Sequence, residues 1–470
     1  MKLIYLLWMQ ILWHYGSVDS MFKSNKNQLE SCFCQLHGVL DDCTCSVDTV
    51  DHFNNVLIYP RLQSLLVNDY FRFYKVNLKK PCPFWSDDSR CAIRYCHVEA
   101  CHESDIPTGL KGHVEEPIPT HNKYTDKSDC TEPDDLNEEL SYLNKTISAD
   151  LYKEFALWKK YDDAQDNFCI NDNEGDTDAE YVDLLLNPER YTGYKGPSAH
   201  RIWRSIYKEN CFRPKKTFTS HVLSDNINNM CLEKRVFYRV VSGLHASINI
   251  HLCSKYLLSE TKKDLSFGPI EGQWGPNLDE FTQRFDPETT NGEGPQWLRN
   301  LYFIYLLELR ALAKAAPYLL QEQYFTGNEL KDEDVRAAIK DLLQVIRSFP
   351  EHFNESTMFN GGQQAQKLKE EFRLHFQNIS KIMDCVGCDK CKLWGKLQVQ
   401  GLGTALKILF SGKFDNVDPN GEDISKLPKR KFQLERSEIV ALLNAFGRLS
   451  TSIFELEELR KRIRTRRIDI

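Results

Sequence analysis

The stretch that decides the fold is 383–410, which reads Met-Asp-Cys-Val-Gly-Cys-Asp-Lys-Cys-Lys-Leu-Trp-Gly-Lys-Leu-Gln-Val-Gln-Gly-Leu-Gly-Thr-Ala-Leu-Lys-Ile-Leu-Phe. It opens with three evenly spaced cysteines, Cys385, Cys388 and Cys391. Apolar residues then recur three and four positions apart over 402–409, which is the spacing of one helix face. The stretch therefore predicts a buried helix whose start carries a cysteine cluster.

This cysteine cluster is open to three chemistries. A bacterial iron–sulfur pattern would continue with a fourth cysteine, but residue 395 is glycine. Zinc would need a distant fourth ligand, which a thiol-rich secreted chain disfavours. The third chemistry is a redox-active Cys388–Cys391 pair, with Cys385 bonded elsewhere. A helix N-terminus favours the thiolate of such a pair, and Lys390 and Lys392 add positive charge. We therefore predict a redox pair and no metal.

Helical spacing of apolar residues recurs through the second half of the chain. It is present over 368–383 and 439–453, and the stretch 298–312 is apolar enough to be fully buried. Strand-like alternation is scarce, and there is no internal repeat. The sequence therefore predicts a mainly α protein, in which residues 21–470 form a single domain with a helical core.

Composition places the chain among globular proteins. Of its 470 residues, 41% are hydrophobic and 27% are charged, which excludes a mostly disordered chain. The formal net charge of −7 argues against a general nucleic-acid binder. No apolar run after the N-terminal segment approaches about 18 residues, so a transmembrane helix is not expected.

The N-terminus predicts secretion. A basic start at Lys2, a short apolar core and small residues form the pattern of a signal peptide over 1–20; the alternative is a buried N-terminal helix. In an oxidising compartment most of the 16 cysteines should be paired. Secretion also agrees with three glycosylation sequons, which begin at Asn144, Asn354 and Asn378.

Ten of the 16 cysteines lie between Cys32 and Cys169, in a proline-containing region that is poor in helical pattern. We expect a loop-rich, disulfide-stapled N-terminal region. Nested bonds, Cys32–Cys45 and Cys34–Cys43, would staple a short hairpin, although three pairings are formally open.

An acidic segment follows the first nine cysteines. Residues 131–180 hold 15 acidic and 4 basic side chains, so we predict a solvated, partly mobile segment. A calcium site is the alternative, but Asp172–Asp176 lacks the EF-hand spacing.

A second candidate redox pair is Cys91-Ala-Ile-Arg-Tyr-Cys96. Arg90 and Arg94 favour a thiolate there, and the surrounding proline, serine, glycine and charged residues predict an exposed, mobile loop. The alternative is one more structural disulfide.

Oxidation of a dithiol releases two electrons, and passing them to oxygen requires a cofactor such as flavin. No Gly-x-Gly-x-x-Gly follows a predicted strand, and Gly401-Leu-Gly403 is better explained by tight helix packing. A flavin would therefore need arginine for its pyrophosphate and aromatic side chains for its rings. Residues 187–203 and 241–248 contain those types; an interior structural histidine is the alternative for His245.

These residues together resemble one family, the endoplasmic-reticulum oxidoreductins, which are flavin-dependent thiol oxidases that re-oxidise protein disulfide isomerase. The resemblance covers nearly all of the chain after the signal peptide. It is carried by 383–410, 187–197, 242–248 and Asn444-Ala-Phe-Gly-Arg448. It implies a single, mainly helical domain that encloses one FAD.

The resemblance implies an electron relay between two cysteine pairs. Cys91 and Cys96 look like the outer shuttle pair, which takes electrons from protein disulfide isomerase. Cys388 and Cys391 look like the inner pair beside the flavin. Electrons would pass from the outer pair to the inner pair by thiol–disulfide exchange, then to FAD and to O2, which yields hydrogen peroxide.

The resemblance also assigns other cysteines. It implies a Cys82–Cys385 bond that anchors a mobile shuttle and regulatory loop, 82–130, near the inner pair, and a structural Cys211–Cys231 bond. Cys169 and Cys253 have no implied partner, and either is a candidate buried free thiol.

Cys101 and Cys130 match the regulatory cysteines of the family. Inhibitory Cys91–Cys130 and Cys96–Cys101 bonds would sequester the shuttle pair, and their reduction would release it.

The resemblance also implies which residues contact FAD, since several positions of this sequence match the family's FAD-binding motifs. They are Arg190, Thr192, Trp203, Ser242, His245 and Arg284. One position departs from the family pattern, because its Gly-Glu-Gly-Pro-Arg-Arg segment ends here in Gln296-Trp297, with Arg299 two positions further on.

The implied compartment is the endoplasmic-reticulum lumen. No retrieval signal ends the chain, so retention would require a partner. The basic end, 460–467, is either a solvated tail or a contact with anionic lipid on the lumenal membrane face. Two other classes compete: a secreted disulfide-rich binding protein, and a disulfide isomerase, which would need a thioredoxin-like βαβ context.

Overall fold

The computed structural model describes Leu36, Leu40 and the ranges 45–85, 96–111, 167–169, 176–189, 196–212, 230–257, 274–320, 322–351, 353, 363–410 and 434–468. The predicted signal peptide, most of the acidic segment and the sequons at Asn144 and Asn354 lie outside these residues. Asn378 lies inside them, in a helix.

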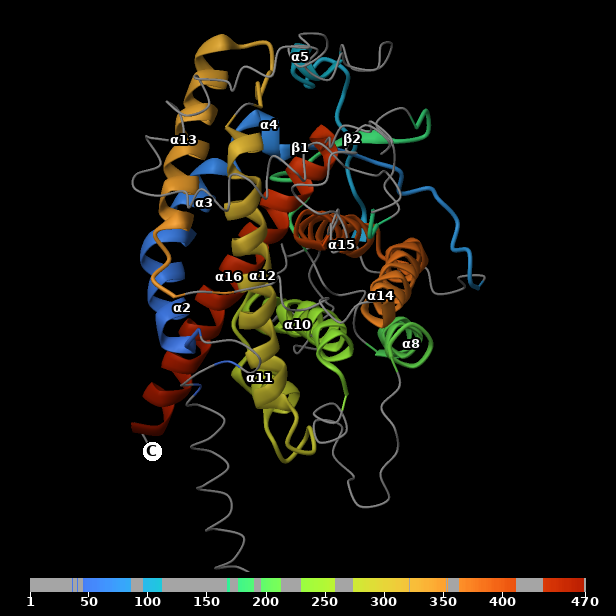
Figure 1. Ribbon diagram of the computed structural model, residues 1–470, viewed down its shortest axis with the longest axis vertical. Helices are drawn as coiled ribbons and strands as arrows, with labels where there is room; N and C mark the ends of the chain where they lie inside the picture. Colours follow the sequence, from blue (N-terminus) through green and yellow to red (C-terminus); the bar gives the residue numbers. More distant parts are fainter. Residues whose placement is uncertain are drawn as a thin grey trace, which may run out of the picture.

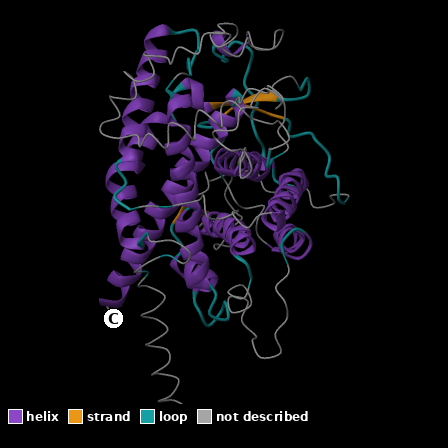
Figure 2. Cartoon of the chain, in the orientation of Figure 1, coloured by secondary structure: helices purple, strands orange, loops and turns teal. Residues whose placement is uncertain are grey.

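Helices dominate the described structure, and strands are short and few (Figure 2). The longer helices are α8 (Gly196–Arg204), α10 (Leu232–Ser254), α11 (Leu278–Phe285), α12 (Gly294–Leu319), α13 (Glu329–Arg347), α14 (Gln363–Ile382), α15 (Asp389–Phe410) and α16 (Arg436–Ile468). The shorter helical elements are α2 (Val47–Phe53), η1 (Asn54–Ile58), α3 (Tyr59–Leu65), α4 (Asp69–Arg72), α5 (Thr108–Lys111), η7 (Ser205–Glu209) and η10 (Met383–Cys385).

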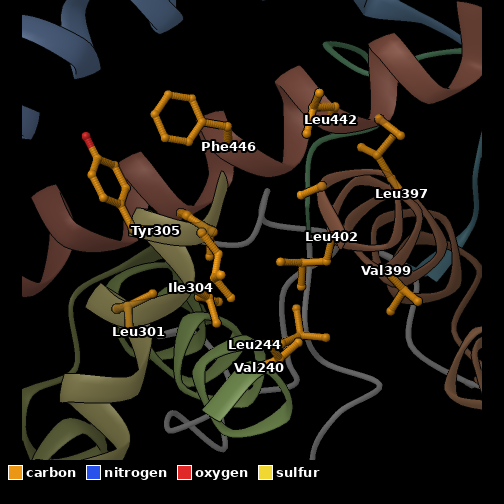
Figure 3. Close-up of a cluster of buried hydrophobic side chains, with 14 of the residues drawn as sticks. Val240, Leu244, Leu301, Ile304, Tyr305, Leu397, Val399, Leu402, Leu442 and Phe446 are labelled. Atoms are coloured by element: carbon orange, nitrogen blue, oxygen red, sulfur yellow. The ribbon is translucent and has the colours of Figure 1, made fainter. Parts of the chain in front are cut away.

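Four long helices, α10, α12, α15 and α16, enclose the core. In Figure 1, α16 crosses the molecule diagonally beside α12, and α10 and α15 lie on the same side of that pair. Figure 3 shows apolar side chains of these helices: Leu244 of α10 and Leu402 of α15 point toward one another, and Tyr305 of α12 lies beside Phe446 of α16. The prediction of a mainly α fold with a helical core is confirmed.

The residue composition of α12 and α13 explains how much of each helix is buried in the core. α12 carries an unbroken apolar run, and every residue of 301–307 is buried, so this helix lies inside the core rather than on its surface. α13 buries one stripe, which includes Val335, Ile339 and Leu342, and exposes its charged face. Its first turn is capped by Asn328, whose side chain accepts a hydrogen bond from the Lys331 amide.

Glycines allow the core helices to approach closely. A Cβ at Gly401 of α15 would overlap the Ala445 Cβ and the Ala441 carbonyl oxygen on α16. A Cβ at Gly243 of α10 would overlap the carbonyl oxygen of Asn300 on α12. The interpretation of Gly401-Leu-Gly403 as a helix-packing element is therefore confirmed at Gly401.

An ion pair also joins α15 to α16 inside the core. The ammonium of Lys407 lies 3.2 Å from the Glu438 carboxylate, and both residues are buried. Replacing one member would leave the other charge unpaired away from water, so the pair holds these two helices in one register.

Two small antiparallel sheets lie outside the helical core. β1 (Phe73–Val76) pairs with β2 (Glu180–Asp183), with Phe73 opposite Asp183. Ala100 bridges to Val182 on the other side of β2. β3 (Tyr256–Leu257) pairs with β4 (Trp274–Gly275). The first sheet brings three distant parts of the chain together next to the N-terminal end of α15.

One described helix is long and apolar enough to cross a membrane. This helix, Arg436–Thr465 within α16, is mostly buried inside the fold. A helix that packs at the centre of a protein passes the same criterion, so the composition of α16 is explained by its core position.

We predict that Gly401→Ala will destabilise the fold by about 1–3 kcal/mol, because the added methyl group must displace backbone atoms of α16. Gly447→Ala on α16 is the matched control: its added Cβ would meet the far end of the flexible Leu66 side chain, which can move. Chemical denaturation should therefore show a larger loss of the free energy of unfolding for Gly401→Ala. Equal losses would contradict the packing argument.

Candidate functional site

The predicted inner pair lies where α14 turns into α15. Cys385 ends the short η10 turn and forms a disulfide with Cys82, 303 positions earlier. Cys388 precedes the first residue of α15, and its carbonyl oxygen accepts a hydrogen bond from the Lys392 amide at 2.7 Å. Cys391 follows in the first turn. Cys388 and Cys391 are both buried, so the structure places the predicted inner pair inside the core, beside the Cys82–Cys385 bond.

Two lysines near the start of α15 also bind residues 77–78, which precede Cys82. The Lys392 ammonium donates to the Leu78 carbonyl at 3.2 Å. The Lys396 ammonium donates to the Asn77 carbonyl at 3.1 Å and pairs with the buried carboxylate of Asp384 at 2.7 Å. Together with the disulfide, these contacts hold residues 77–82 against the inner pair.

Of the predicted outer pair, the structure describes only Cys96. Cys91 lies outside the described residues. Cys96 is buried and forms a disulfide, whereas Cys101 carries a free thiol, so the predicted inhibitory Cys96–Cys101 bond is not formed in this structure. Burial, and then the negative charge of Asp183, raise the pKa of Cys101 to about 11. Cys101 is therefore a weak nucleophile in this arrangement. Cys130 is also outside the described residues.

Four of the six predicted FAD contacts are described, and three of them gather around one aromatic cluster. The rings of Trp203 and His245 stack, with centroids 3.6 Å apart and planes 18° from parallel. The Tyr207 hydroxyl lies 3.3 Å from Nδ1 of His245. Asn300 donates to the Ser242 hydroxyl at 3.0 Å, and Tyr238 contacts the same hydroxyl. α8, η7, α10 and α12 each contribute to this cluster.

His245 is a neutral imidazole in this cluster. Burial, together with the positive charge of Arg284, lowers its pKa from 6.5 to about 3. A neutral, flat ring suits stacking on an uncharged aromatic ligand better than an imidazolium would, because it needs no counter-ion.

Arg284 supplies the cation near the cluster. One of its amino groups donates to the Asn249 side chain at 2.7 Å, and the guanidinium pairs with Glu280 at 2.6 Å. Trp297, which stands where the family pattern has arginine, is hydrogen-bonded to the hydroxyl of Tyr238. Position 297 therefore still reaches the cluster, but with an aromatic ring in place of a charge.

This set of side chains fits a flavin dinucleotide. Trp203 and His245 offer flat faces for ring systems, Ser242 offers a hydroxyl, and Arg284 offers a guanidinium for phosphate oxygens. Arg190 and Thr192 lie outside the described residues, but the described chain ends its 176–189 range directly before them. Among the described residues, no group of three or more histidine, cysteine or acidic side chains could hold a metal ion.

The remaining cysteines divide by environment. The implied Cys211–Cys231 bond is not formed in this structure: both residues carry free thiols, Cys211 buried after η7 and Cys231 exposed at the start of α10. Cys169 and Cys253 are buried, as expected of interior thiols, and Cys169 donates to the Val399 carbonyl at 3.3 Å. Cys45 is buried; Cys32, Cys34 and Cys43 lie outside the described residues.

The structure contains a buried charge network that the sequence did not reveal. Glu189 pairs with Arg448 of α16 and accepts a hydrogen bond at 2.6 Å from Gln398 of α15. His251 of α10 lies between Glu189 and Glu455, at 3.6 and 3.5 Å. The only sequence signal was indirect: Glu189 and Arg448 both belong to segments that carried the family resemblance.

A buried cysteine pair at a helix start, beside a long-range disulfide in a mainly helical fold, indicates a protein of thiol–disulfide chemistry. The family model described as Endoplasmic Reticulum Oxidoreductin 1 (ERO1) matches residues 57–456. The chain belongs to this family, so it is an oxidoreductin, an enzyme that makes disulfides by thiol oxidation.

Curated relatives agree with this family along almost the whole chain. It is similar to the Ero1-like protein of Drosophila melanogaster, with 55% identity over 97% of this chain and 95% of the relative. It is also similar to the human ERO1-like protein alpha, with 50% identity over 96% of each.

Solved structures show the same fold. The structure titled "Structure of Ero1p, Source of Disulfide Bonds for Oxidative Protein Folding in the Cell" matches with a TM-score of 0.55 and 29% identity, over 90% of this chain and 99% of that one. A double cysteine-to-alanine mutant of Saccharomyces cerevisiae Ero1p matches with a TM-score of 0.55 and 28% identity, over 90% and 99%.

We predict that the His245 ring will stay neutral as the pH falls from 8 to about 4.5, because its pKa is about 3. The unfolded chain would bind a proton near pH 6.5 and the folded chain would not, so this residue contributes a loss of stability as the pH falls below about 6.5. Nuclear magnetic resonance of histidine-labelled protein, assigned with His245→Gln, would follow the titration. A midpoint near pH 6.5 at His245 would contradict the burial argument.

Proposed function

We propose that this oxidoreductin is a flavin-dependent thiol oxidase that re-oxidises protein disulfide isomerase and reduces O2 to hydrogen peroxide. The observation that carries the proposal is the position of the Cys388–Cys391 pair. It is buried at the start of α15, and the Cys82–Cys385 disulfide ties it to the chain segment that leads to Cys91 and Cys96.

Burial explains why two cysteine pairs are needed. Cys388 and Cys391 are 1% and 0% exposed, so no protein thiol can approach them from solution. The outer pair, Cys91 and Cys96, would instead meet the isomerase. Its disulfide accepts two electrons from the two isomerase thiols, which become a disulfide, and the outer pair becomes a dithiol. A second exchange then reduces the inner disulfide and restores the outer one.

A bound FAD would supply the two-electron chemistry that links oxidation of the inner dithiol, with loss of two electrons and two protons, to reduction of O2 to hydrogen peroxide. In the chain itself, Arg284, with Arg190 and Thr192, would bind the phosphates. Trp203 and His245 would stack on the rings, and Ser242 would donate a hydrogen bond. His245 would remain neutral throughout, because burial lowers its pKa by disfavouring the charged form.

Cys101 and Cys130 would form the regulatory bonds with the outer pair. The high pKa of Cys101 supports a slow switch, since little thiolate is present near neutral pH to attack a disulfide. Formation of Cys91–Cys130 and Cys96–Cys101 would require Cys96 to exchange its present disulfide.

The lumen of the endoplasmic reticulum is the proposed compartment. A removed segment 1–20, Cys32–Cys45 and Cys34–Cys43 bonds, and glycans at Asn144, Asn354 and Asn378 are proposed with it. Asn378 is partly exposed on α14. A retaining partner, or association of the basic end of α16 with the lumenal membrane face, would keep the protein there.

Bound flavin and oxygen consumption would distinguish an oxidase from a binding protein whose cysteines are purely structural. Purified protein should absorb at about 450 nm, as oxidised flavins do, and should consume oxygen with reduced isomerase. Colourless protein that consumes no oxygen would refute the proposed function, and exchange of isomerase thiols without oxygen would indicate a disulfide isomerase.

We predict that Cys391→Ala will lower oxygen consumption at least about a hundredfold with flavin still bound, because the inner disulfide cannot form. An oxygen electrode and the flavin absorbance measure the two effects separately. Cys253→Ala, which removes another buried thiol on α10, is the control and should keep its rate per bound flavin. Normal turnover by Cys391→Ala would contradict the assignment.

We predict that Cys130→Ala will raise the initial rate of oxygen consumption and shorten any lag, because the shuttle pair can no longer be sequestered. Non-reducing peptide mapping of the resting enzyme should show the loss of a bond to Cys91. An unchanged rate would remove the regulatory role from the proposal.

A further inference from the structure

The segment Asn187-Pro188-Glu189 joins β2 to the predicted phosphate-binding residue Arg190. Asn187 is 0% exposed, and no chemical role has been assigned to it above. Its side chain and its carbonyl oxygen point to two different partners, and each partner lies three residues after a predicted redox cysteine.

The Asn187 side chain holds the chain that leaves the outer pair. Its Oδ1 accepts a hydrogen bond from the Glu99 amide at 2.9 Å, and its Nδ2 donates to the Glu99 carbonyl at 2.9 Å. Glu99 is three residues beyond Cys96. Just past it, Ala100 bridges to Val182 on β2, so the flank of the outer pair is bound on one side by the sheet and on the other by Asn187.

The backbone of the same residue holds the helix of the inner pair. The indole N–H of Trp394 donates to the Asn187 carbonyl at 2.8 Å. Trp394 lies on α15, three residues beyond Cys391, in the turn that follows the inner pair. A single buried residue therefore contacts both cysteine-bearing segments directly.

Glu189 fixes the segment 187–189 to the helical core. This carboxylate is 6% exposed, pairs with Arg448 of α16 and accepts from Gln398 of α15. Asn187 is also tied to the preceding turn, since its amide donates to the Asp183 carbonyl at 3.0 Å. A buried charge held on two helices gives the Asn187 contacts a rigid base.

We propose that Asn187 is a positioning residue that aligns the outer cysteine pair with the inner pair. Thiol–disulfide exchange needs the attacking thiolate in line with the target bond, so small displacements of one segment slow the transfer strongly. Both segments meet at one residue, the outer one at the Asn187 side chain and the inner one at its carbonyl oxygen, which keeps their spacing constant while the outer pair exchanges with its partner. The inference rests on the proposed two-pair relay.

The test is Asn187→Ala in the full-length, flavin-loaded enzyme. We expect the rate of oxygen consumption with reduced isomerase, per bound flavin, to fall roughly tenfold or more, with the KM for isomerase unchanged within about twofold. Rapid alkylation and mass spectrometry during turnover should find the outer pair accumulating as the dithiol while the inner pair stays oxidised. Loss of fold alone would not produce that distribution.

Glu438→Gln is the matched control, because it also breaks a buried polar contact of α15 but lies away from both cysteine segments. Its rate per bound flavin should equal that of the unmodified enzyme. Asn187→Asp keeps the acceptor for the Glu99 amide and loses the donor, so its rate should be intermediate. If Asn187→Ala does not fold, Trp394→Phe removes the same junction from the α15 side and should give the same accumulation.

Two outcomes separate the inference from the proposed function. If the unmodified enzyme binds no flavin or consumes no oxygen, the proposed function fails. If it is active, and Asn187→Ala or Trp394→Phe turns over per bound flavin like Glu438→Gln without accumulating the outer dithiol, the positioning role of Asn187 is overturned and the oxidase assignment stands.

Discussion

The Cys82–Cys385 disulfide is the constraint on which the site depends. It joins a segment near the N-terminal sheet to the residue three positions before Cys388, across 303 positions of sequence. Lys392 and Lys396 reinforce it by binding the carbonyl oxygens of Leu78 and Asn77. The first half of the chain is fastened here to the start of α15, where Cys388 and Cys391 are buried in the helical core.

The helical core makes this arrangement selective. Close packing at Gly401 and the buried Lys407–Glu438 pair hold the C-terminal half of α15 against α16, while the inner cysteine pair is buried at the N-terminal start of α15. Cys388 and Cys391 are both buried, which limits direct contact with thiols from solution. The aromatic cluster around His245 lies on α10, which packs in the same core.

Much of this could be predicted from sequence. Helical periodicity located α12, α15 and α16, because a helix face must repeat every three to four residues to be buried. The cysteine spacing over 385–391 indicated a redox pair, and the family resemblance supplied the Cys82–Cys385 bond that the structure forms. Arg448 was quoted only as part of a motif: its role emerged when folding placed it beside Glu189.

The sequence by itself determined the fold class, several of the core helices and the chemistry available, because these follow from local spacing and residue type. Only the tertiary structure decided which residues meet. Asn187 reaches both Glu99 and Trp394, Trp297 hydrogen-bonds to Tyr238, and Cys211 and Cys231 occupy different environments. Such contacts depend on how distant segments pack in three dimensions, and no local pattern in the sequence encodes them.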